Sequence, residues 1–167
     1  FYPYFRFDGF SAKGTDRQWT VVSLENDYIK LTLFPEIGGK IWGAVDKTTG
    51  KEFIYNNHVV KFRDIAMRGP WTSGGIEFNF GIIGHAPTAS TPVDCVTRQK
   101  PDGSVSCYVS SYELVTRTLW TVEVNLPKDK AYFTTTTTWH NSSSIHQPYY
   151  QWMNAGYPAA GNVEFCY

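Results

Sequence analysis

The feature that most restricts the fold of this chain is the short distance between its turn signals. Clusters of Gly, Pro, Asn and Asp recur at short intervals, as in the segments 35–39 and 46–50. Between such clusters apolar and polar residues alternate, which is typical of half-buried β-strands; Ile29 and Leu31, for example, flank Lys30. No stretch shows the helical spacing of apolar residues. We therefore predict an all-β fold built from antiparallel strands.

The alternation also predicts where the strands lie. In one of them, Ala131–His140, five consecutive threonines are β-branched and therefore favour an extended backbone. The last residues, Val163–Tyr167, have the apolar character of a strand that has just begun, so we expect this chain to be the N-terminal part of a larger protein. The expected strands are Tyr28–Phe34, Lys40–Val45, Glu52–Tyr55, Ile76–Phe80, Asp94–Gln99, Ser104–Glu113, Leu114–Leu126, Ala131–His140 and Tyr149–Tyr157.

Composition narrows the classes of partner. A chain of 167 residues with 42% hydrophobic residues suits one domain, residues 1–167. Lys plus Arg and Asp plus Glu number 15 each, so no net charge is available to attract nucleic acid or anionic lipid. No apolar run is long enough to span a membrane, and Phe1–Phe10 lacks the aliphatic core of a signal peptide. We expect neither nucleic-acid nor membrane partners.

The cysteines argue against a metal centre. Cys95, Cys107 and Cys166 lie too far apart for the paired spacing of a zinc site, and no cofactor motif is present, so neither metal nor cofactor is expected. Cys95 and Cys107 flank the turn-like Pro101–Gly103, where they could face each other across a hairpin. Two alternatives remain for this pair: a disulfide, which would fit an exported protein, or two buried thiols. The compartment stays open, with an exported protein, periplasmic or extracellular, favoured.

Residues 61–92 hold so many glycines and prolines that long loops are expected around one short strand, Ile76–Phe80. Long loops in a compact domain commonly carry function. Aromatic residues make up 17% of the chain, with 6 Trp, 11 Tyr and 11 Phe. Such rings stack against the apolar faces of sugars, although they also build β-sheet cores.

Three sequence segments resemble one known family. The first is YIKLTLFPEIGGKIWGAVDKTTGKEFIY, Tyr28–Tyr55, which is similar to the opening strands of galactose-mutarotase-like proteins. The second is W-x-x-GGIEFNFG-x-x-GHAPT, Trp71–Thr88, followed by Thr91–Asp94, and the third is N-x-x-x-x-x-QPYYQWMNA, Asn141–Ala155. These two resemble a bacterial domain of unknown function within that superfamily, found N-terminal to tetratricopeptide repeats.

The resemblance implies a supersandwich of two large antiparallel sheets that binds sugars on the concave face of one sheet. Complete members of the superfamily are longer than this chain, so the resemblance also implies that part of the sandwich is missing. An incomplete sandwich leaves an open sheet edge, so we expect either self-association or pairing with a C-terminal part of the same protein.

Aldose epimerases of this superfamily use a histidine acid and a carboxylate base on opposite sides of the sugar ring. The segment that resembles their histidine region reads Tyr149–Asn154 and contains no histidine. His140 ends a predicted strand and His146 lies in a Ser/Pro loop, so both fit surface positions. An epimerase is therefore the weaker alternative to a glycoside hydrolase.

A glycoside hydrolase needs two carboxyl groups, and Glu77 is the best candidate for the acid. Gly74 and Gly75 would let the backbone approach a ligand, while Phe78 and Phe80 would provide an apolar setting that raises the pKa of the Glu77 carboxyl. A structural alternative is that Glu77 only binds loop amides. The second carboxylate remains open: it could be Asp94, Glu36 or Asp64, or it could be absent from this chain.

The remaining candidates are ligand-binding residues. Strand alternation puts Asn79 on the face of Glu77, and a histidine in the tight loop after this strand could contact a sugar. We predict a saccharide-binding pocket formed by Glu77 as the catalytic acid together with Trp71, Asn79, His85, Tyr150, Trp152 and Asn154. Three functions remain open: a glycoside hydrolase or related sugar-processing enzyme, a non-catalytic carbohydrate-binding module, and a structural domain in which Trp71 and Trp152 are buried in the core.

Overall fold

The computed structural model describes residues 11–64, 69–80 and 84–166. The expectation that Phe1–Phe10 is no signal peptide concerns residues outside this part of the chain. Tyr167, the last residue of the strand expected at Val163–Tyr167, also lies outside it. Within the described residues there is no α-helix, and no helix that could cross a membrane. Every strand pairing is antiparallel, so the predicted all-β antiparallel class is confirmed.

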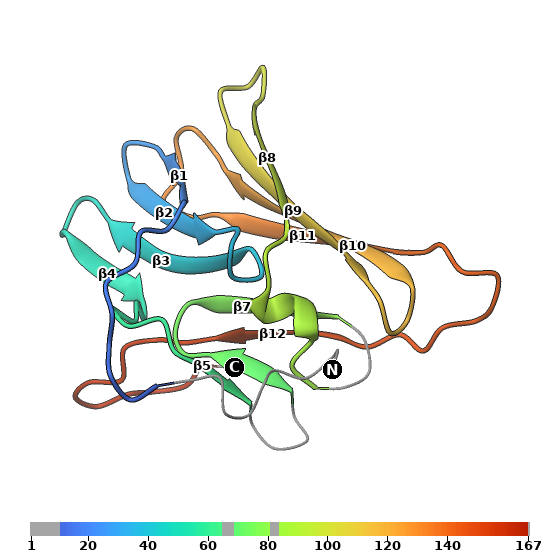
Figure 1. Cartoon of the computed structure of the whole chain (residues 1–167). Helices are drawn as coiled ribbons and strands as arrows, with labels where there is room; N and C mark the ends of the chain where they lie inside the picture. Colours follow the sequence, from blue (N-terminus) through green and yellow to red (C-terminus); the bar gives the residue numbers. More distant parts are fainter. Residues whose placement is uncertain (1–10, 65–68, 81–83, 167) are drawn as a thin grey trace.

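The strands form two main sheets and one hairpin (Figure 1). In the six-stranded sheet the order is β1-β2-β3-β7-β12, with β4 paired to β3, and in the four-stranded sheet it is β11-β10-β9-β8. The six-stranded sheet contains β1 (Val22–Glu25), β2 (Ile29–Phe34), β3 (Lys40–Asp46), β4 (Lys51–Ile54), β7 (Ile76–Phe80) and β12 (Gln151–Ala155). The other strands are β8 (Asp94–Gln99), β9 (Val105–Glu113), β10 (Thr118–Leu126), β11 (Thr134–Asn141) and the hairpin strands β5 (Phe62–Asp64) and β6 (Pro70–Thr72).

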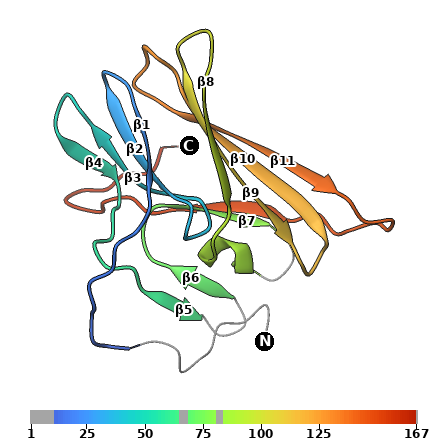
Figure 2. The same ribbon diagram turned by 45° about the horizontal axis from the view of Figure 1, so that its top comes forward.

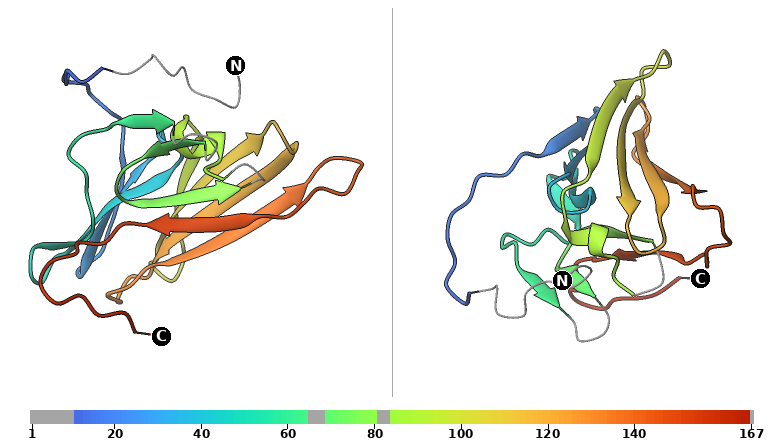
Figure 3. Two further views of the ribbon diagram at one scale, coloured as in Figure 1. Left: turned by 90° about the horizontal axis from the view of Figure 1, so that it is seen from below. Right: turned by 45° about the vertical axis from the view of Figure 1, so that its right-hand side comes forward.

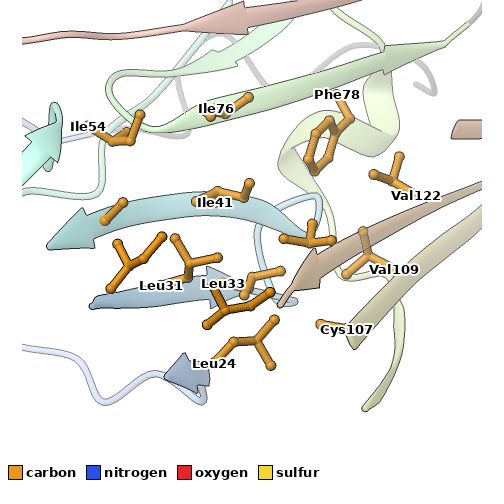
Figure 4. Close-up of a cluster of buried hydrophobic side chains, with 14 of the residues drawn as sticks. Leu24, Leu31, Leu33, Ile41, Ile54, Ile76, Phe78, Cys107, Val109 and Val122 are labelled. Carbon is orange, nitrogen blue, oxygen red and sulfur yellow. The ribbon is translucent and has the colours of Figure 1, made fainter. Parts of the chain in front are cut away.

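One hydrophobic core fills the space between the two sheets. Leucines and isoleucines from β1, β2 and β3 meet Phe78 of β7, and all of them face Cys107, Val109 and Val122 of the other sheet (Figure 4). Phe80 stacks on Trp120 with ring centroids 4.6 Å apart. The alternation read from the sequence is therefore correct for β10, whose even-numbered residues are all buried.

The opposite face of the six-stranded sheet is also covered in part. Phe34, Ile37 and Trp42 form a second cluster there, and Trp19 packs edge-on against Phe34 with centroids 5.2 Å apart. The β5–β6 hairpin and the 3-10 turn η2 (Pro87–Ser90) lie over the same face (Figure 2). Short elements thus enclose a polar region on this outer face.

Two sheet edges lie on one side of the molecule. Among the described strands, β12 pairs only with β7, and β11 pairs only with β10. Figure 3 shows β11 (orange) and β12 (red) on the same side of the molecule. The two edges touch where the Thr135 hydroxyl lies 3.9 Å from the sulfur of Met153 and where Trp139 meets Tyr149 at 4.6 Å between centroids. This side of the sandwich is not closed by a further strand in the described part of the chain.

Several predicted boundaries are wrong. The strand expected from Leu114 begins only at Thr118, because residues 114–117 form a turn in which the Glu113 carboxylate accepts hydrogen bonds from Thr116 N and Oγ1, at 2.6 and 2.9 Å. The expected strand Tyr149–Tyr157 is reduced to β12, and residues 163–166 are not extended into a paired strand. Strands β1, β5 and β6 were not predicted: β1 alternates but has only four residues, and β5 and β6 have three each, too few for a clear pattern.

Candidate functional site

The candidate site lies on the outer face of the six-stranded sheet, over its strands β3, β7 and β12. Residues 76, 78 and 80 of β7 face the core, so Glu77 and Asn79 point to the other side. The register of β12 pairs Trp152 with Asn79 and Asn154 with Glu77, which puts these four side chains on one face.

Glu77 is the buried centre of the site, with 1% of its surface exposed. Its Oε1 atom accepts a hydrogen bond from Nδ2 of Asn79 at 2.7 Å and lies 2.5 Å from Nδ1 of His85. Its Oε2 atom has no hydrogen-bond partner and lies 3.8 Å from Nζ of Lys40. One carboxylate therefore connects strand β3, strand β7 and the loop that follows β7.

Lys40 supplies the positive charge opposite Glu77. Its side chain is fully enclosed, and Nζ donates hydrogen bonds to the backbone oxygen of Thr72 at 2.8 Å and to the Thr72 hydroxyl at 3.0 Å. Burial lowers the pKa of Lys40 to about 8, although the charge of Glu77 works in the opposite direction. The ammonium also lies 5.6 Å from the centre of the Trp42 ring. Lys40 thus attaches the β5–β6 hairpin to the sheet.

The loop that carries His85 is held by Asn79. The Asn79 Oδ1 atom accepts a hydrogen bond from the backbone N–H of Ala86 at 2.9 Å. The 3-10 turn η2, which follows this loop and contains Ala89, packs against Gly38. A Cβ on Gly38 would lie 2.4 Å from the backbone of Ala89, so only glycine allows this close approach. The loop is therefore fixed against the sheet from two directions, and the imidazole is positioned with it.

Two tryptophans flank His85. The ring of Trp152 approaches the imidazole edge-on with centroids 5.0 Å apart, and the ring of Trp71 is tilted at 6.5 Å. Both indoles are half-buried, while His85 is 8% exposed and Asn154 is exposed. The outer surface of the site is thus formed by aromatic rings, one imidazole and one amide.

The structure brings together most of the residues that the sequence analysis proposed. Glu77, Asn79, His85, Trp71 and Trp152 are connected by direct contacts. Asn154 lies beside Glu77 in the strand pairing, whereas Tyr150 precedes β12, is half-exposed, and makes no hydrogen bond or ring contact with described residues.

The expected surroundings of Glu77 are wrong in two respects. Phe78 and Phe80 belong to the core on the other face of β7, so they do not surround the carboxylate. Gly75 does not open the backbone to a ligand either; a Cβ there would lie 2.4 Å from the backbone oxygen of Ile41, so this glycine lets β7 approach β3. The neighbours of Glu77 are polar.

Among the described residues, no hydrogen bond joins Glu77 to a second carboxylate. Within the described chain, its hydrogen bonds and ion pairs involve Asn79, His85 and Lys40. Glu36 instead accepts a hydrogen bond from Thr20 N at 2.8 Å and pairs with Arg17 at 3.5 Å. Asp94 begins β8 in the other sheet, and Asp64 ends β5. The described residues also contain no group of three or more His, Cys, Asp or Glu side chains that could hold a metal ion.

Lys40 and Thr72 are the site residues that the sequence analysis missed. Alternation within Lys40–Val45 puts the side chains of Lys40 and Ile41 on opposite faces of the strand. Because Ile41 faces the core, this pattern could have placed Lys40 on the outer face with Glu77. The burial of its ammonium depends on Thr72, which is 32 residues away in the sequence. No local pattern predicts that contact.

Comparison with known proteins gives two matches. The sequence profile of a family described as a domain of unknown function, DUF5107, matches residues 1–167. The fold is similar to the crystal structure of a TPR-domain containing protein from Parabacteroides distasonis ATCC 8503, with a TM-score of 0.87 and 28% sequence identity. That match covers 95% of this chain and 27% of the other, so the chain spans about a quarter of the length of that protein. The chain belongs to the DUF5107 family.

Proposed function

We propose that this domain binds a saccharide on the outer face of its six-stranded sheet, against Trp152, Trp71 and His85. The observation that carries the proposal is the imidazole held between two half-buried indoles, with Nδ1 fixed by a buried carboxylate. Indole faces stack on the C–H surfaces of a pyranose, and a fixed imidazole can bond a hydroxyl through its other nitrogen. The exposed amide of Asn154 adds a donor and an acceptor on the same face.

The resemblance to galactose-mutarotase-like proteins supports this choice of ligand. Members of that superfamily bind sugars on the face of a large antiparallel sheet, and the candidate site lies on such a face. Saccharide binding and the relation to this superfamily are thus parts of one proposal.

Binding explains the geometry better than acid catalysis by Glu77 does. A glycosidase acid must reach the glycosidic oxygen of its substrate. Glu77 is enclosed, its Oε1 atom is occupied by Asn79 and His85, and its Oε2 atom faces Lys40. We therefore assign Glu77 as a positioning residue for His85, in place of the catalytic acid expected from the sequence.

A sugar-processing enzyme is the second candidate, and the contact between Glu77 and His85 favours it. A carboxylate on Nδ1 sets the tautomer and orientation of an imidazole, so that Nε2 can exchange protons with a substrate. The aldose epimerase arrangement fits less well. An acid and a base that contact each other leave no room for a sugar ring between them.

The test is a panel of monosaccharides and oligosaccharides measured by isothermal titration calorimetry, with reducing-sugar release assayed in the same samples. We expect saturable binding of at least one saccharide, and Trp152→Ala should weaken it about tenfold, since one aromatic stacking contact contributes about 1.5 kcal/mol. Tyr112→Ala is the matched control, because Tyr112 is an exposed aromatic residue on strand β9 of the other sheet.

Absence of saturable binding across the panel, or equal losses in the two variants, would reject the proposed site. Turnover that disappears in His85→Gln while binding is retained would support the second candidate function.

A further inference from the structure

We propose that Cys95 and Cys107 are a reversible redox pair that a small-molecule disulfide oxidises to a protein disulfide. Cys95 lies on β8 and Cys107 on the neighbouring strand β9. Both are free thiols, and their sulfur atoms lie 3.3 Å apart. This site is separate from the proposed saccharide site, which lies on the other sheet.

The strand register explains why the two thiols meet without being directly opposite. Cys95 pairs with Val109, and Cys107 pairs with Thr97, so the two cysteines are diagonal neighbours on one face of the hairpin. Diagonal neighbours in antiparallel strands have Cα atoms about 7–8 Å apart, which exceeds the usual span of a disulfide, about 4.4–6.8 Å. Closing the bond therefore requires a shift of one strand.

Strand β8 is the one that can shift. It is the edge strand of the four-stranded sheet, and its residues are mostly exposed. A bond closed by displacing this strand is strained, and strained disulfides are reduced more easily than structural ones. The geometry therefore favours a disulfide that forms under oxidising conditions and reopens when the thiol concentration rises.

Burial assigns different roles to the two thiols. Cys107 is fully buried, and this burial, with a smaller contribution from its hydrogen bond to Cys95, raises the pKa of its thiol. Cys95 is half-buried, so it is the thiol that meets a reagent from solution. The thiolate is the reacting form, which makes Cys95 the first to react and Cys107 the second.

Oxidised glutathione can serve as the oxidant. The Cys95 thiolate attacks one glutathione sulfur, an S–S bond forms between them, and one glutathione thiolate leaves. Cys107 then loses its proton to solvent and attacks the Cys95 sulfur, which expels the second glutathione thiolate. Two protein thiols are oxidised, and one glutathione disulfide is reduced to two thiols.

The experiment uses the Cys166→Ser variant, because Cys166 is exposed and would react by itself. The folded protein is incubated with oxidised glutathione, quenched with acid and a thiol-alkylating reagent, and analysed by peptide mass spectrometry. We expect the peptides that contain Cys95 and Cys107 to become linked with the loss of two hydrogens, and excess reduced glutathione to reverse the link.

Two further variants test the order of the steps. With Cys107→Ser, a stable glutathione adduct should accumulate on Cys95; with Cys95→Ser, Cys107 should stay unmodified while circular dichroism shows an intact fold. The proposal is overturned if the glutathione adduct on Cys95 persists when Cys107 is present, or if neither thiol of the folded protein reacts. A link that resists excess reduced glutathione would overturn its reversibility.

Discussion

Lys40 Nζ and Glu77 Oε2 lie 3.8 Å apart, and each side chain is 1% exposed. Two opposite charges are thus enclosed between the six-stranded sheet and the segments that cover it. Removing one partner of such a pair leaves the other charge buried without compensation, which costs more than the pair itself contributes. Replacing Lys40 or Glu77 alone should therefore destabilise the protein, whereas replacing both together should cost much less.

We expect Glu77→Gln to lower the free energy of unfolding by about 3 kcal/mol, because the ammonium of Lys40 then stays buried without its counter-charge. The double variant Lys40→Met/Glu77→Gln should recover most of this loss, since it removes both charges. Urea denaturation of the wild type, both single variants and the double variant gives the coupling energy. Additive losses in the double variant would show that the two charges do not interact.

Alkaline pH should stabilise the protein through Lys40. Burial lowers the pKa of Lys40 from 10.5 to about 8. Between these two values Lys40 is protonated in the unfolded chain but not in the folded chain. The free energy of unfolding therefore rises with pH across this interval, and this gain is lost again as pH falls through about 8. The contribution is on the order of 3 kcal/mol. Urea denaturation from pH 7 to pH 10.5 measures it, and Lys40→Met, which lacks the titrating amine, should show a smaller rise.

Gly75 and Gly50 form a matched pair for testing the close approach of β7 to β3. Both have a left-handed backbone, with φ of +71° and +70°, but a Cβ on Gly75 would lie 2.4 Å from Ile41 O, whereas a Cβ on Gly50 meets nothing within 4 Å. We expect Gly50→Ala to cost about 1 kcal/mol from backbone strain alone and Gly75→Ala about 3 kcal/mol from strain plus overpacking. Thermal unfolding compares them, and equal costs would contradict the close contact.

The open edge at β12 should lead to self-association. This strand carries no charged residue, and Tyr149, Tyr150 and Met153 are among the exposed large apolar side chains. An unpaired, uncharged edge can bind a strand from another chain. We expect sedimentation equilibrium to show a mass that rises with concentration, and Met153→Lys to reduce it. Leu119→Lys on strand β10 is the control, because Leu119 is also exposed but lies within a sheet. A monomer at every concentration would contradict this prediction.

Local patterns predicted most of the strands. The bounds of β7 and β8 were correct, and β2, β3, β9 and β11 differ from expectation by a few residues at most. Alternation also put Glu77 with Asn79 and Trp152 with Asn154, because side chains on a strand point to opposite faces in turn. These results follow from interactions between residues that are close in the sequence.

The polar character of the site could not be predicted in this way. The hydrogen bond that Asn79 accepts from the backbone N–H of Ala86 and the one that Lys40 donates to Thr72 arise only when separate segments fold over the sheet. Strands β5 and β6 have three residues each among glycines and prolines, too few for a periodic signal. Their cover over the sheet decides whether Lys40 is enclosed or exposed.

The pairing of β12 with β7 has a consequence for synthesis on the ribosome. All four strands of the second sheet lie between these two partners in the sequence, and those four can pair with their neighbours as soon as they emerge. Trp152 reaches Asn79 only after them, so a nascent chain that ends before Gln151 can hold Glu77 and His85 but lacks the second indole. Until β12 has been synthesised, the edge of β7 that pairs with it stays uncovered. A chaperone that covers this edge during synthesis would protect both the hydrophobic core and the candidate site from incorrect strand pairing.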